Sequence, residues 1–395
     1  MSHLSCLAAR TRARAAVSRR RVGLAALAGA LVLTACGATD EPLGTSPDTS
    51  GPEDDAGIVA EPGTEPEPGT EPEAEPESEG EEGPTGPPVT IAFAGDVMFE
   101  GMIEPQLEAD PAGLLAPIAP VFAQADLTVV NLETAITERG DPEPKGFTFR
   151  APPSGLTALQ HAGVDVVSLA NNHGMDYGQT GLEDTLDAAD AAGMPLVGAG
   201  RDLDEAFAPH IATIRGRQIA VIGATQVMDT MFFDTWPATD ERPGLAFAKH
   251  EHEADLIDAV TEAREQADTV VVYLHWGVEG ERCPTERQQG LAQRLADAGA
   301  DIVVGTHAHR LQGTGMLDDT LIDYGLGNFV FYSQHSPGID SGVLLVTVEG
   351  QEIIDHEWVP ATLREGIPHP LEGDEAAAAI DDWAELRDCT GLEPG

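Results

Sequence analysis

The sequence contains few basic residues for its length. Of its 395 residues, 21 are lysine or arginine and 68 are aspartate or glutamate, so the formal net charge is -47. Nucleic acids are bound mainly by lysine and arginine side chains that neutralise phosphates. We therefore expect no nucleic-acid partner, and the length allows one large domain or two ordinary ones.

The glycine-rich fingerprints of nucleotide-binding proteins are also absent. No P-loop and no dinucleotide-binding pattern occurs in the sequence. No internal repeat is found after residue 88. These absences argue against a nucleotide held by one of the common phosphate-binding loops.

An apolar stretch near the N-terminus, residues 22–35, is too short for a comfortable membrane span, which needs about 20 residues. Arginines precede it and Cys36 follows it, which is the order of an export signal. The ending LTAC-G resembles a bacterial lipobox. We expect a signal peptide over residues 1–35, a lipid anchor on Cys36 and a location on the extracytoplasmic face of the cell membrane. An ordinary cleaved signal is the alternative, and the arginines at 19–21 leave Sec and twin-Arg export both open.

Large apolar side chains are almost missing from residues 36–88, which repeat proline, glutamate and glycine. Such a segment cannot bury enough surface to offset the entropy of ordering. Like charges and proline keep it extended. We predict a disordered acidic linker that holds the domain at residues 89–395 away from the membrane, with mimicry of an acidic polymer as the alternative.

Cysteine is scarce, with four in the whole chain. Cys6 lies in the predicted signal peptide and Cys36 is the predicted lipidation site, which leaves Cys283 and Cys389. Outside the cytosol such a pair is more often a disulfide than two free thiols. We predict a bridge that ties the C-terminal tail to the loop after HWGVEGER.

Apolar runs alternate with helical patterns from residue 89 onward. The predicted strands are residues 89–95, 127–133, 164–171, 218–225, 269–277 and 300–307. The predicted helices, most with apolar residues at three- and four-residue spacing, are residues 154–163, 180–193, 252–267 and 286–300. Later segments, residues 320–333, 342–350 and 353–360, look like successive antiparallel strands. This order predicts an α/β protein with two packed sheets flanked by helices.

Polar residues gather at the carboxyl ends of the predicted strands. They are Asp96, Asn131, Glu133, Asn171, Asn172, His173, Asp176, His275, Trp276, Glu279, His307 and His309. Open α/β sheets place ligands just outside these ends. Imidazoles together with carboxylates suit Zn, Mn, Fe and similar ions, and the set has the ligands that a two-metal hydrolase needs.

Individual roles follow from the chemistry of each side chain. Asn172 offers an amide oxygen to an ion, and His173 is placed to protonate a leaving group. Asp176 can hold the other nitrogen of His173 and fix its tautomer. The spacing of His307 and His309 puts both rings on one face of an extended strand, whereas a loop can split them between two ions.

Six motifs taken in order resemble the CapA family of poly-γ-glutamate capsule proteins, which includes PgsA. They are GDVMFEG, NLETAIT, ANNHGMDYGQTGLEDTL, HWGVEGE, GADIVVGTHAHRLQG and DYGLGNFVF, and the resemblance spans residues 89–359. It implies the four-layer α/β/β/α sandwich of calcineurin-like metallophosphoesterases and two divalent ions, Mn, Fe or Zn. The implied ligands are Asp96, Glu133 and His309 for one ion, and Glu133, Asn172, His275 and His307 for the other, with His173 as the general acid.

The motifs depart from the metallophosphoesterase pattern in several places. The usual Asp-x-His start is here Asp96-Val97-Met98, so one histidine ligand is missing. The shared carboxylate is a glutamate instead of an aspartate. Within CapA-like proteins, GTHAHR departs from the commoner proline between the two histidines. These departures leave open whether the protein binds one ion tightly and the second weakly.

Other residues near the motifs carry two interpretations each. Arg310 and Asn328 are predicted to contact the substrate, with an exposed loop arginine and a turn asparagine as the alternatives. Glu279 is either a residue that supports the ligands or a plain exposed glutamate. Trp276 is either part of the core or a platform for the substrate.

The resemblance implies an exported metal-dependent hydrolase in capsule or poly-γ-glutamate biosynthesis or release. Its expected partners are the anionic polymer, the membrane through the lipid anchor, and subunits of a membrane polymer synthase. One alternative is a metallophosphoesterase that acts on a phosphorylated wall or lipid substrate. Another is a non-catalytic polymer-binding subunit, and the residues do not choose between phosphoester and amide bonds.

Overall fold

Two mixed β-sheets form the framework of the structure. The computed structural model describes residues 87–395. The predicted signal peptide, the lipidation site Cys36 and almost all of the predicted linker lie outside the described residues. Within this part of the chain, no helix combines the length and the apolar character needed to span a bilayer.

The first sheet contains β1 (Val89–Val97), β2 (Leu127–Leu132), β5 (Val166–Ser168), β6 (Leu196–Val197), β15 (Asn328–Val330), β16 (Asp340–Glu349), β17 (Glu352–Arg364) and β18 (Ile367–Pro370). Its order is β18-β17-β16-β1-β2-β5-β6, and β15 also pairs with β1. The strands β15, β1, β2, β5 and β6 are parallel, whereas β16, β17 and β18 extend the sheet in antiparallel fashion. The carboxyl ends of the parallel strands therefore meet at one edge.

The second sheet contains β8 (His210–Ile214), β9 (Arg217–Thr225), β11 (Thr269–His275), β12 (Ile302–Thr306), β13 (Thr314–Leu317) and β14 (Thr320–Asp323). Its order is β13-β14-β12-β11-β9-β8. The four central strands are parallel and the two edge strands are antiparallel. Strand β11 is buried along its whole length, as expected for a continuous apolar run in the middle of a parallel sheet.

Helices and short strand pairs surround the two sheets. The α-helices are α1 (Glu104–Ala109), α2 (Ala119–Phe122), α3 (Ser154–Ala162), α4 (Gly178–Ala192), α5 (Leu203–Phe207), α6 (Glu253–Arg264), α7 (Glu286–Ala298) and α8 (Gly373–Ala384). The 3-10 helices are η1 (Thr230–Phe232), η2 (His250–His252) and η3 (Glu385–Cys389). The short pairs are β3 (Ala135–Ile136) with β4 (Arg150–Ala151), and β7 (Ala199–Gly200) with β10 (Gly244–Leu245).

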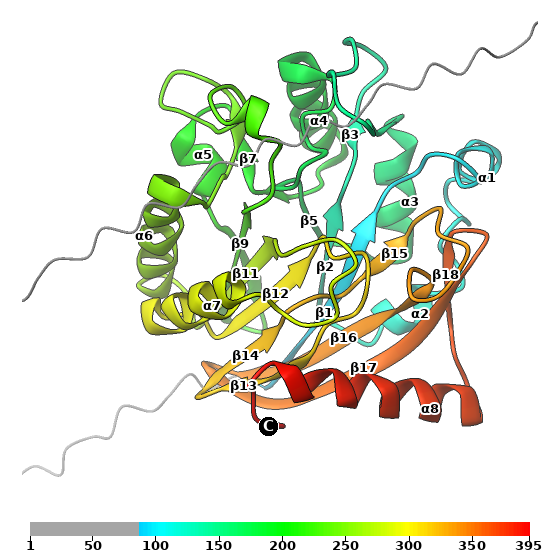
Figure 1. Ribbon diagram of the computed structural model, residues 1–395, viewed down its shortest axis with the longest axis vertical. Coiled ribbons are helices and arrows are strands. Elements are labelled where there is room, and N and C mark those ends of the chain that lie inside the picture. Colours follow the sequence, from blue (N-terminus) through cyan, green and yellow to red (C-terminus); the bar gives the residue numbers. More distant parts are fainter. Residues whose placement is uncertain (1–86) are drawn as a thin grey trace, which may run out of the picture. The chain divides into compact units, whose positions relative to one another are not determined.

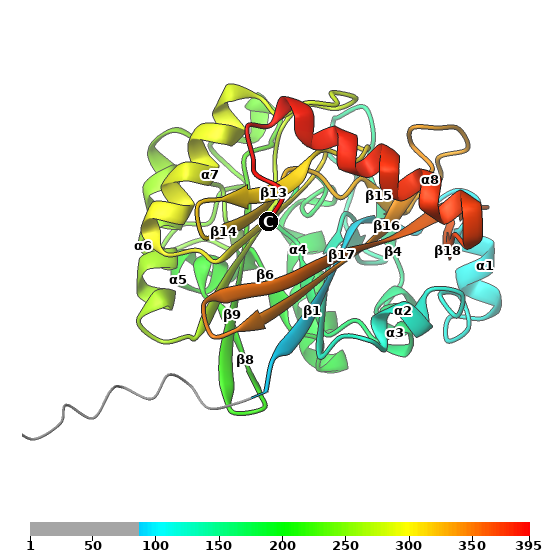
Figure 2. The same ribbon diagram turned by 90° about the horizontal axis from the view of Figure 1, so that it is seen from below.

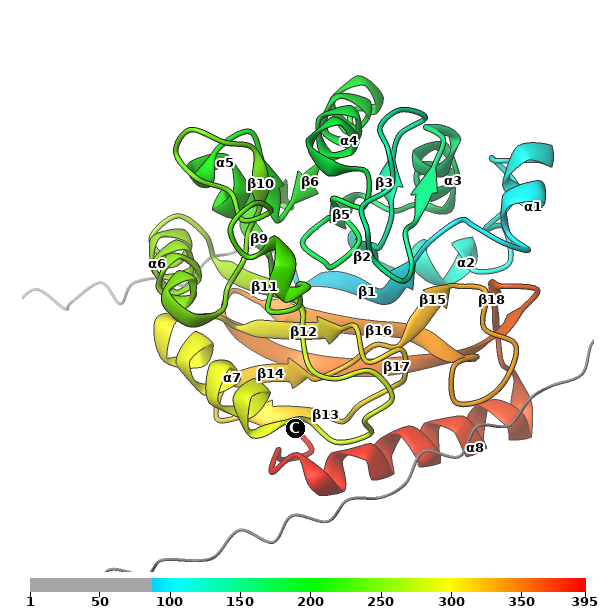
Figure 3. The same cartoon turned by 45° about the horizontal axis from the view of Figure 1, so that its top comes forward.

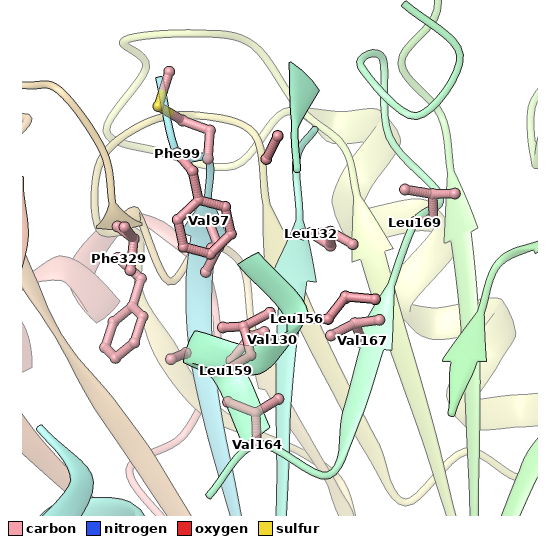
Figure 4. Packing of buried hydrophobic residues seen from close by; sticks show 14 of the residues in the cluster. Val97, Phe99, Val130, Leu132, Leu156, Leu159, Val164, Val167, Leu169 and Phe329 are labelled. Carbon is pink, nitrogen blue, oxygen red and sulfur yellow. The ribbon is translucent and has the colours of Figure 1, made fainter. Parts of the chain in front are cut away.

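Three apolar clusters define four layers (Figures 1 and 3). One cluster lies between the two sheets and contains Phe93 of β1 and Val271 of β11. A second lies between the first sheet and the helices α1 to α4, and Figure 4 shows Leu156 and Leu159 of α3 beside Val130 of β2. A third lies between the second sheet and the helices α5 to α7. The predicted four-layer α/β/β/α sandwich is therefore confirmed.

Local sequence signals explain where several elements begin and end. Thr285 caps α7 in a reciprocal capping box with Gln288, which satisfies backbone donors that the helix leaves open. Gly299 ends the same helix in the left-handed conformation, with φ 105°. Helices α3 and α4 also end at left-handed glycines, Gly163 and Gly193.

Two parts of the fold differ from the prediction. The predicted strand at residues 320–333 is two strands, because a left-handed turn at Gly327 (φ 67°) carries the chain from β14 in the second sheet to β15 in the first. Helix α8 was not predicted. It lies along β17, with Trp383 stacked on Trp358 at 5.5 Å between ring centroids (Figures 2 and 3).

A disulfide holds the C-terminal end of the described chain. It joins Cys283 to Cys389, as predicted from the cysteine count, and the two residues are 106 positions apart in the sequence. Cys389 ends η3, which follows α8, and Cys283 lies just before α7. The bridge therefore ties the C-terminal helix to the loop after β11.

We expect Gly95→Ala to destabilise the protein. A Cβ atom at position 95 would lie 1.9 Å from the carbonyl oxygen of Gly327, so the chain must shift where β1 ends. Crowding of this kind costs about 2 kcal/mol of unfolding free energy. Urea denaturation of Gly95→Ala measures the loss. Gly146→Ala is the matched control because no atom lies within 4 Å of its added Cβ, and equal stability of both variants would contradict the expectation.

We also expect the variant with Cys283→Ser and Cys389→Ser to lose about 2–4 kcal/mol of unfolding free energy, because the unfolded chain regains the freedom that the bridge removes. Denaturation of the wild type and of the double variant, each with and without reductant, checks this. Reductant should destabilise the wild type to the level of the double variant and leave the variant unchanged. A double variant as stable as the oxidised wild type would speak against the bridge.

Candidate metal centre

The polar residues that follow the parallel strands come together where both sheets present their carboxyl ends. The first sheet supplies Asp96, Glu133, Asn172, His173 and Asp176, and the second sheet supplies His275, His307 and His309. Most of these side chains are buried, and Asp96, Glu133 and Asp176 are fully buried. The residues that the sequence analysis placed at the strand ends therefore lie close together.

Two of the three groups of possible ligand atoms share one carboxylate. Asp96, Glu133 and His309 form one group, and Glu133, His275 and His307 form the other, each with its ligand atoms within 4.8 Å of one another. In the second group, Asn172 Oδ1 lies 2.7 Å from His275 Nε2. Glu133 lies between the groups, with its Oε1 3.5 Å from His275 Nε2 and 3.9 Å from His309 Nε2. This is the division that the resemblance implied.

A chain of amides fixes the carboxylate end of the site. The amide of Asn131 donates to Asp96 Oδ1 at 2.8 Å, and the amide of Asn171 donates to Asn131 Oδ1 at 3.0 Å. Asn131 Nδ2 also lies 3.3 Å from His275 Nδ1, so one residue of the first sheet contacts ligands from both sheets. Through these contacts the two asparagines orient ligand side chains of the site.

The two histidines of GTHAHR lie on a loop with an unusual backbone. His307 has φ 92° and His309 has φ 52°, in the left-handed region that residues other than glycine seldom adopt. The segment is therefore not extended, which excludes the arrangement with both rings on one face of a strand. His307 lies with Glu133 and His275, and His309 lies with Asp96 and Glu133, while both rings also lie near Glu279. Backbone strain of this kind is often found at functional sites.

The electrostatics of the cluster fit a divalent cation. Both carboxylate oxygens of Glu133 are buried without a hydrogen-bond partner among the described residues, and so is Nδ1 of His307. Burial and the neighbouring Asp96 raise the pKa of Glu133 well above its ordinary value. Burial lowers the pKa of His307 to about 3, which keeps that ring neutral and able to ligate. Buried polar groups normally have partners, and here a cation would provide them.

His309 completes the first group with a different electrostatic character. Burial alone would lower its pKa, but Glu133 and Asp96 outweigh that effect and raise the pKa to about 10. Its Nδ1 lies 3.3 Å from Asp96 Oδ2 and 2.8 Å from Asn328 Oδ1. Because metal ligands must be deprotonated, an ion bound here displaces a proton from this ring.

His173 stands beside the ligands with its ring held by two contacts. Its Nδ1 lies 2.6 Å from Asp176 Oδ2, and the ring stacks on Phe149 at 4.2 Å between centroids. The backbone N–H of Phe149 also donates to Asp176 Oδ2, at 2.6 Å. Burial lowers the pKa of His173. The contact between His173 and Asp176 that the sequence predicted is present.

Lys145 is a site residue that the sequence reasoning missed. Its Nζ lies 2.8 Å from Asp176 Oδ1 and also donates to the backbone carbonyl of Asn172. The Lys145 side chain is 7% exposed, so this ion pair is largely shielded from water. The chain contains only two lysines, and that scarcity is the signal that could have pointed to Lys145.

The remaining predicted residues differ in how far they are buried. Trp276 is fully buried and its indole donates to the carbonyl of Tyr324, so it belongs to the core. Asn328 is also fully buried, and its amide group contacts His309, Ser333 and Gly338. The side chain of Asn328 is therefore not accessible for the predicted contact with the substrate. Arg310 donates to Gly280 and is partly exposed, while Glu279 is exposed beside the histidines.

Comparisons with known proteins identify the family. The model of the bacterial capsule synthesis protein PGA_cap matches residues 90–333. The PGA biosynthesis protein CapA of Bacillus subtilis (strain 168) is 31% identical over 290 residues, 72% of this chain and 74% of that protein. The capsule biosynthesis protein CapA of Bacillus anthracis is 33% identical over 231 residues, 58% of this chain and 54% of that protein. The chain thus spans about half the length of the second relative.

Solved structures show weaker similarity. A hypothetical protein from Thermus thermophilus is 20% identical, with a TM-score of 0.44 over 70% of this chain and 100% of the other. A phosphatase from Mycoplasma pneumoniae is 14% identical, with a TM-score of 0.42 over 70% of this chain and 94% of the other. Because the family model matches more than half of the chain and includes every motif residue of the site, this chain belongs to the bacterial capsule synthesis protein PGA_cap family, as its resemblance to CapA implied.

Proposed function

We propose that this protein is an exported metal-dependent hydrolase that acts in the synthesis or release of poly-γ-glutamate or a related anionic cell-surface polymer. The observation that carries the hydrolase part is Glu133, a buried carboxylate without hydrogen-bond partners that two groups of ligands share. The names of the Bacillus relatives, a PGA biosynthesis protein and a capsule biosynthesis protein, support the choice of polymer.

The residues of the site divide the work of such a reaction. Two divalent ions held by the two ligand groups would activate a water molecule and polarise the bond to be cleaved. His173 lies beside the ligands, and in its imidazolium form it can give the Nε2 proton to the leaving group while its Nδ1–H still donates to Asp176. Lys145 binds the other oxygen of Asp176 and the carbonyl of Asn172, so it fixes the segment that carries the acid.

Anionic substrates have a contact beside the site. Nε of Arg310 is buried without a hydrogen-bond partner among residues 87–395, while its Nη1 donates to Gly280. A guanidinium that follows a metal ligand in sequence suits a carboxylate or a phosphate. The proposal therefore includes both an amide bond of an acidic polymer and a phosphoester as the bond that is cleaved.

The proposed location follows from the N-terminal sequence. Lipidation of Cys36 after removal of residues 1–35 would anchor the domain to the outer face of the cell membrane. Subunits of a membrane polymer synthase are the protein partners that this location makes accessible. Metabolic labelling with a fatty acid, compared between the wild type and Cys36→Ser, tests the anchor.

Glu133→Gln should remove bound metal. The substitution keeps the shape of the side chain and deletes the charge that both ligand groups share, so each ion loses a charged ligand. Elemental mass spectrometry of protein purified without chelator measures the change. Wild type should carry about two equivalents of Mn, Fe or Zn. The control Glu138→Gln, which changes an exposed glutamate, should carry the same amount. Unchanged metal in Glu133→Gln would refute the shared-ligand role.

His173→Asn should lower hydrolysis by at least about 100-fold while metal content stays unchanged, because a general acid contributes on that order. Rates on poly-γ-glutamate and on simple phosphate esters measure the loss and identify the bond. His161→Asn, an exposed histidine on α3, is the control. If the wild type hydrolyses neither substrate and binds the polymer as well as His173→Asn does, the protein is a binding subunit and the proposed reaction is wrong.

A further inference from the structure

One of the two ligand groups is short of a ligand in this chain. Asp96, Glu133 and His309 bring three side chains together, whereas the other group has four with Asn172. The residue that follows Asp96 by two positions is Met98. It is fully buried in the apolar cluster under the first sheet, so it offers nothing to an ion.

Glu279 lies beside His309, one member of this incomplete group. One carboxylate oxygen of Glu279 and one ring nitrogen each of His307 and His309 lie within 4.8 Å of one another. Two ligand atoms on one first-row ion are roughly 3–4 Å apart, given bonds of about 2.0–2.2 Å. Glu279 is exposed, so its side chain is free to change rotamer.

The backbone around Glu279 is fixed to the histidine loop. The N–H of Gly280 donates to the carbonyl of Ala308 at 2.9 Å, and Arg310 donates to the carbonyl of Gly280 at 2.7 Å. On the other side, the N–H of Trp276 donates to Thr306. An exposed glutamate on a free loop would have no such restraint, so the position of Glu279 relative to His309 is part of the fold.

Two groups at this place have no protein partner. Among the described residues, the carboxylate of Glu279 has no hydrogen bond or ion pair. Nδ1 of the buried His307 has no hydrogen-bond partner either. The unpaired nitrogen of His307 belongs to the neighbouring ligand group, whereas the carboxylate of Glu279, beside His309, is available to a cation.

We propose that Glu279 is the fourth protein ligand of the ion at Asp96, Glu133 and His309, and that it takes the place of the histidine that this chain lacks. The inference rests on the metal centre of the proposed function. Three carboxylates and one imidazole make this position rich in oxygen, which suits Mn²⁺, whereas the position with two imidazoles also suits Zn²⁺. The two ions would therefore be held by ligand sets that differ in their proportion of oxygen and nitrogen atoms.

Titration of the metal-free protein with Mn²⁺ tests this, with isothermal calorimetry for affinity and electron paramagnetic resonance for the number of bound ions. Wild type should bind two ions. Glu279→Gln should bind one ion as the wild type does and the other at least about tenfold more weakly. Glu281→Gln is the matched control, since it removes an exposed glutamate two residues away and should bind both ions normally.

The outcomes separate this inference from the function on which it rests. If Glu133→Gln loses both ions and Glu279→Gln binds both with wild-type affinity, the metal centre stands and the role of Glu279 is overturned. A wild type that binds one ion, unaffected by Glu279→Gln, also overturns it. A wild type that binds no ion overturns the inference and the proposed hydrolase together. Thermal denaturation without metal should show equal stability for Glu279→Gln and the wild type, because the side chain is exposed.

Discussion

The structure depends on one costly constraint, the burial of Glu133. A carboxylate removed from water without a hydrogen-bond partner is unfavourable, and its pKa is accordingly raised by burial and by Asp96. The surrounding residues reduce this cost without removing it, since His275 and His309 approach within 3.5 Å and 3.9 Å and neither makes a hydrogen bond to it. A folded chain that keeps such a group at the meeting point of two sheets is adapted to a cation.

The sandwich supplies the geometry that this constraint requires. Neither sheet holds a complete ligand group, because the carboxylates follow strands of the first sheet and the imidazoles follow strands of the second. The relative position of the sheets is set by the apolar cluster between them and by the buried hydroxyl of Tyr273, which donates to Ala94 in the first sheet. The packing between the two sheets therefore also determines how the ligands of one sheet are placed relative to those of the other.

The sequence was sufficient for the sheets, their carboxyl edge and the residues that meet there, because a buried strand that ends in polar residues is a local pattern. It was not sufficient for features that depend on distant contacts. Lys145 reaches Asp176 across 31 positions of sequence, and the carbonyl of Gly327 meets the end of β1 through folding alone. The left-handed backbone conformation of His307 and His309 could not be predicted, because neither position is a glycine. Helix α8 was missed because its alanine-rich sequence packs only partly against β17 and has no buried residue.

The disulfide has a consequence for when the site becomes complete. Cys283 is in the same loop as Glu279, and its partner Cys389 is near the end of the chain. Thiols stay reduced in a typical cytosol and pair in oxidising surroundings. The loop therefore receives this restraint only where oxidation is possible. Completion of this edge of the candidate metal centre thus depends on the redox conditions around the folded chain.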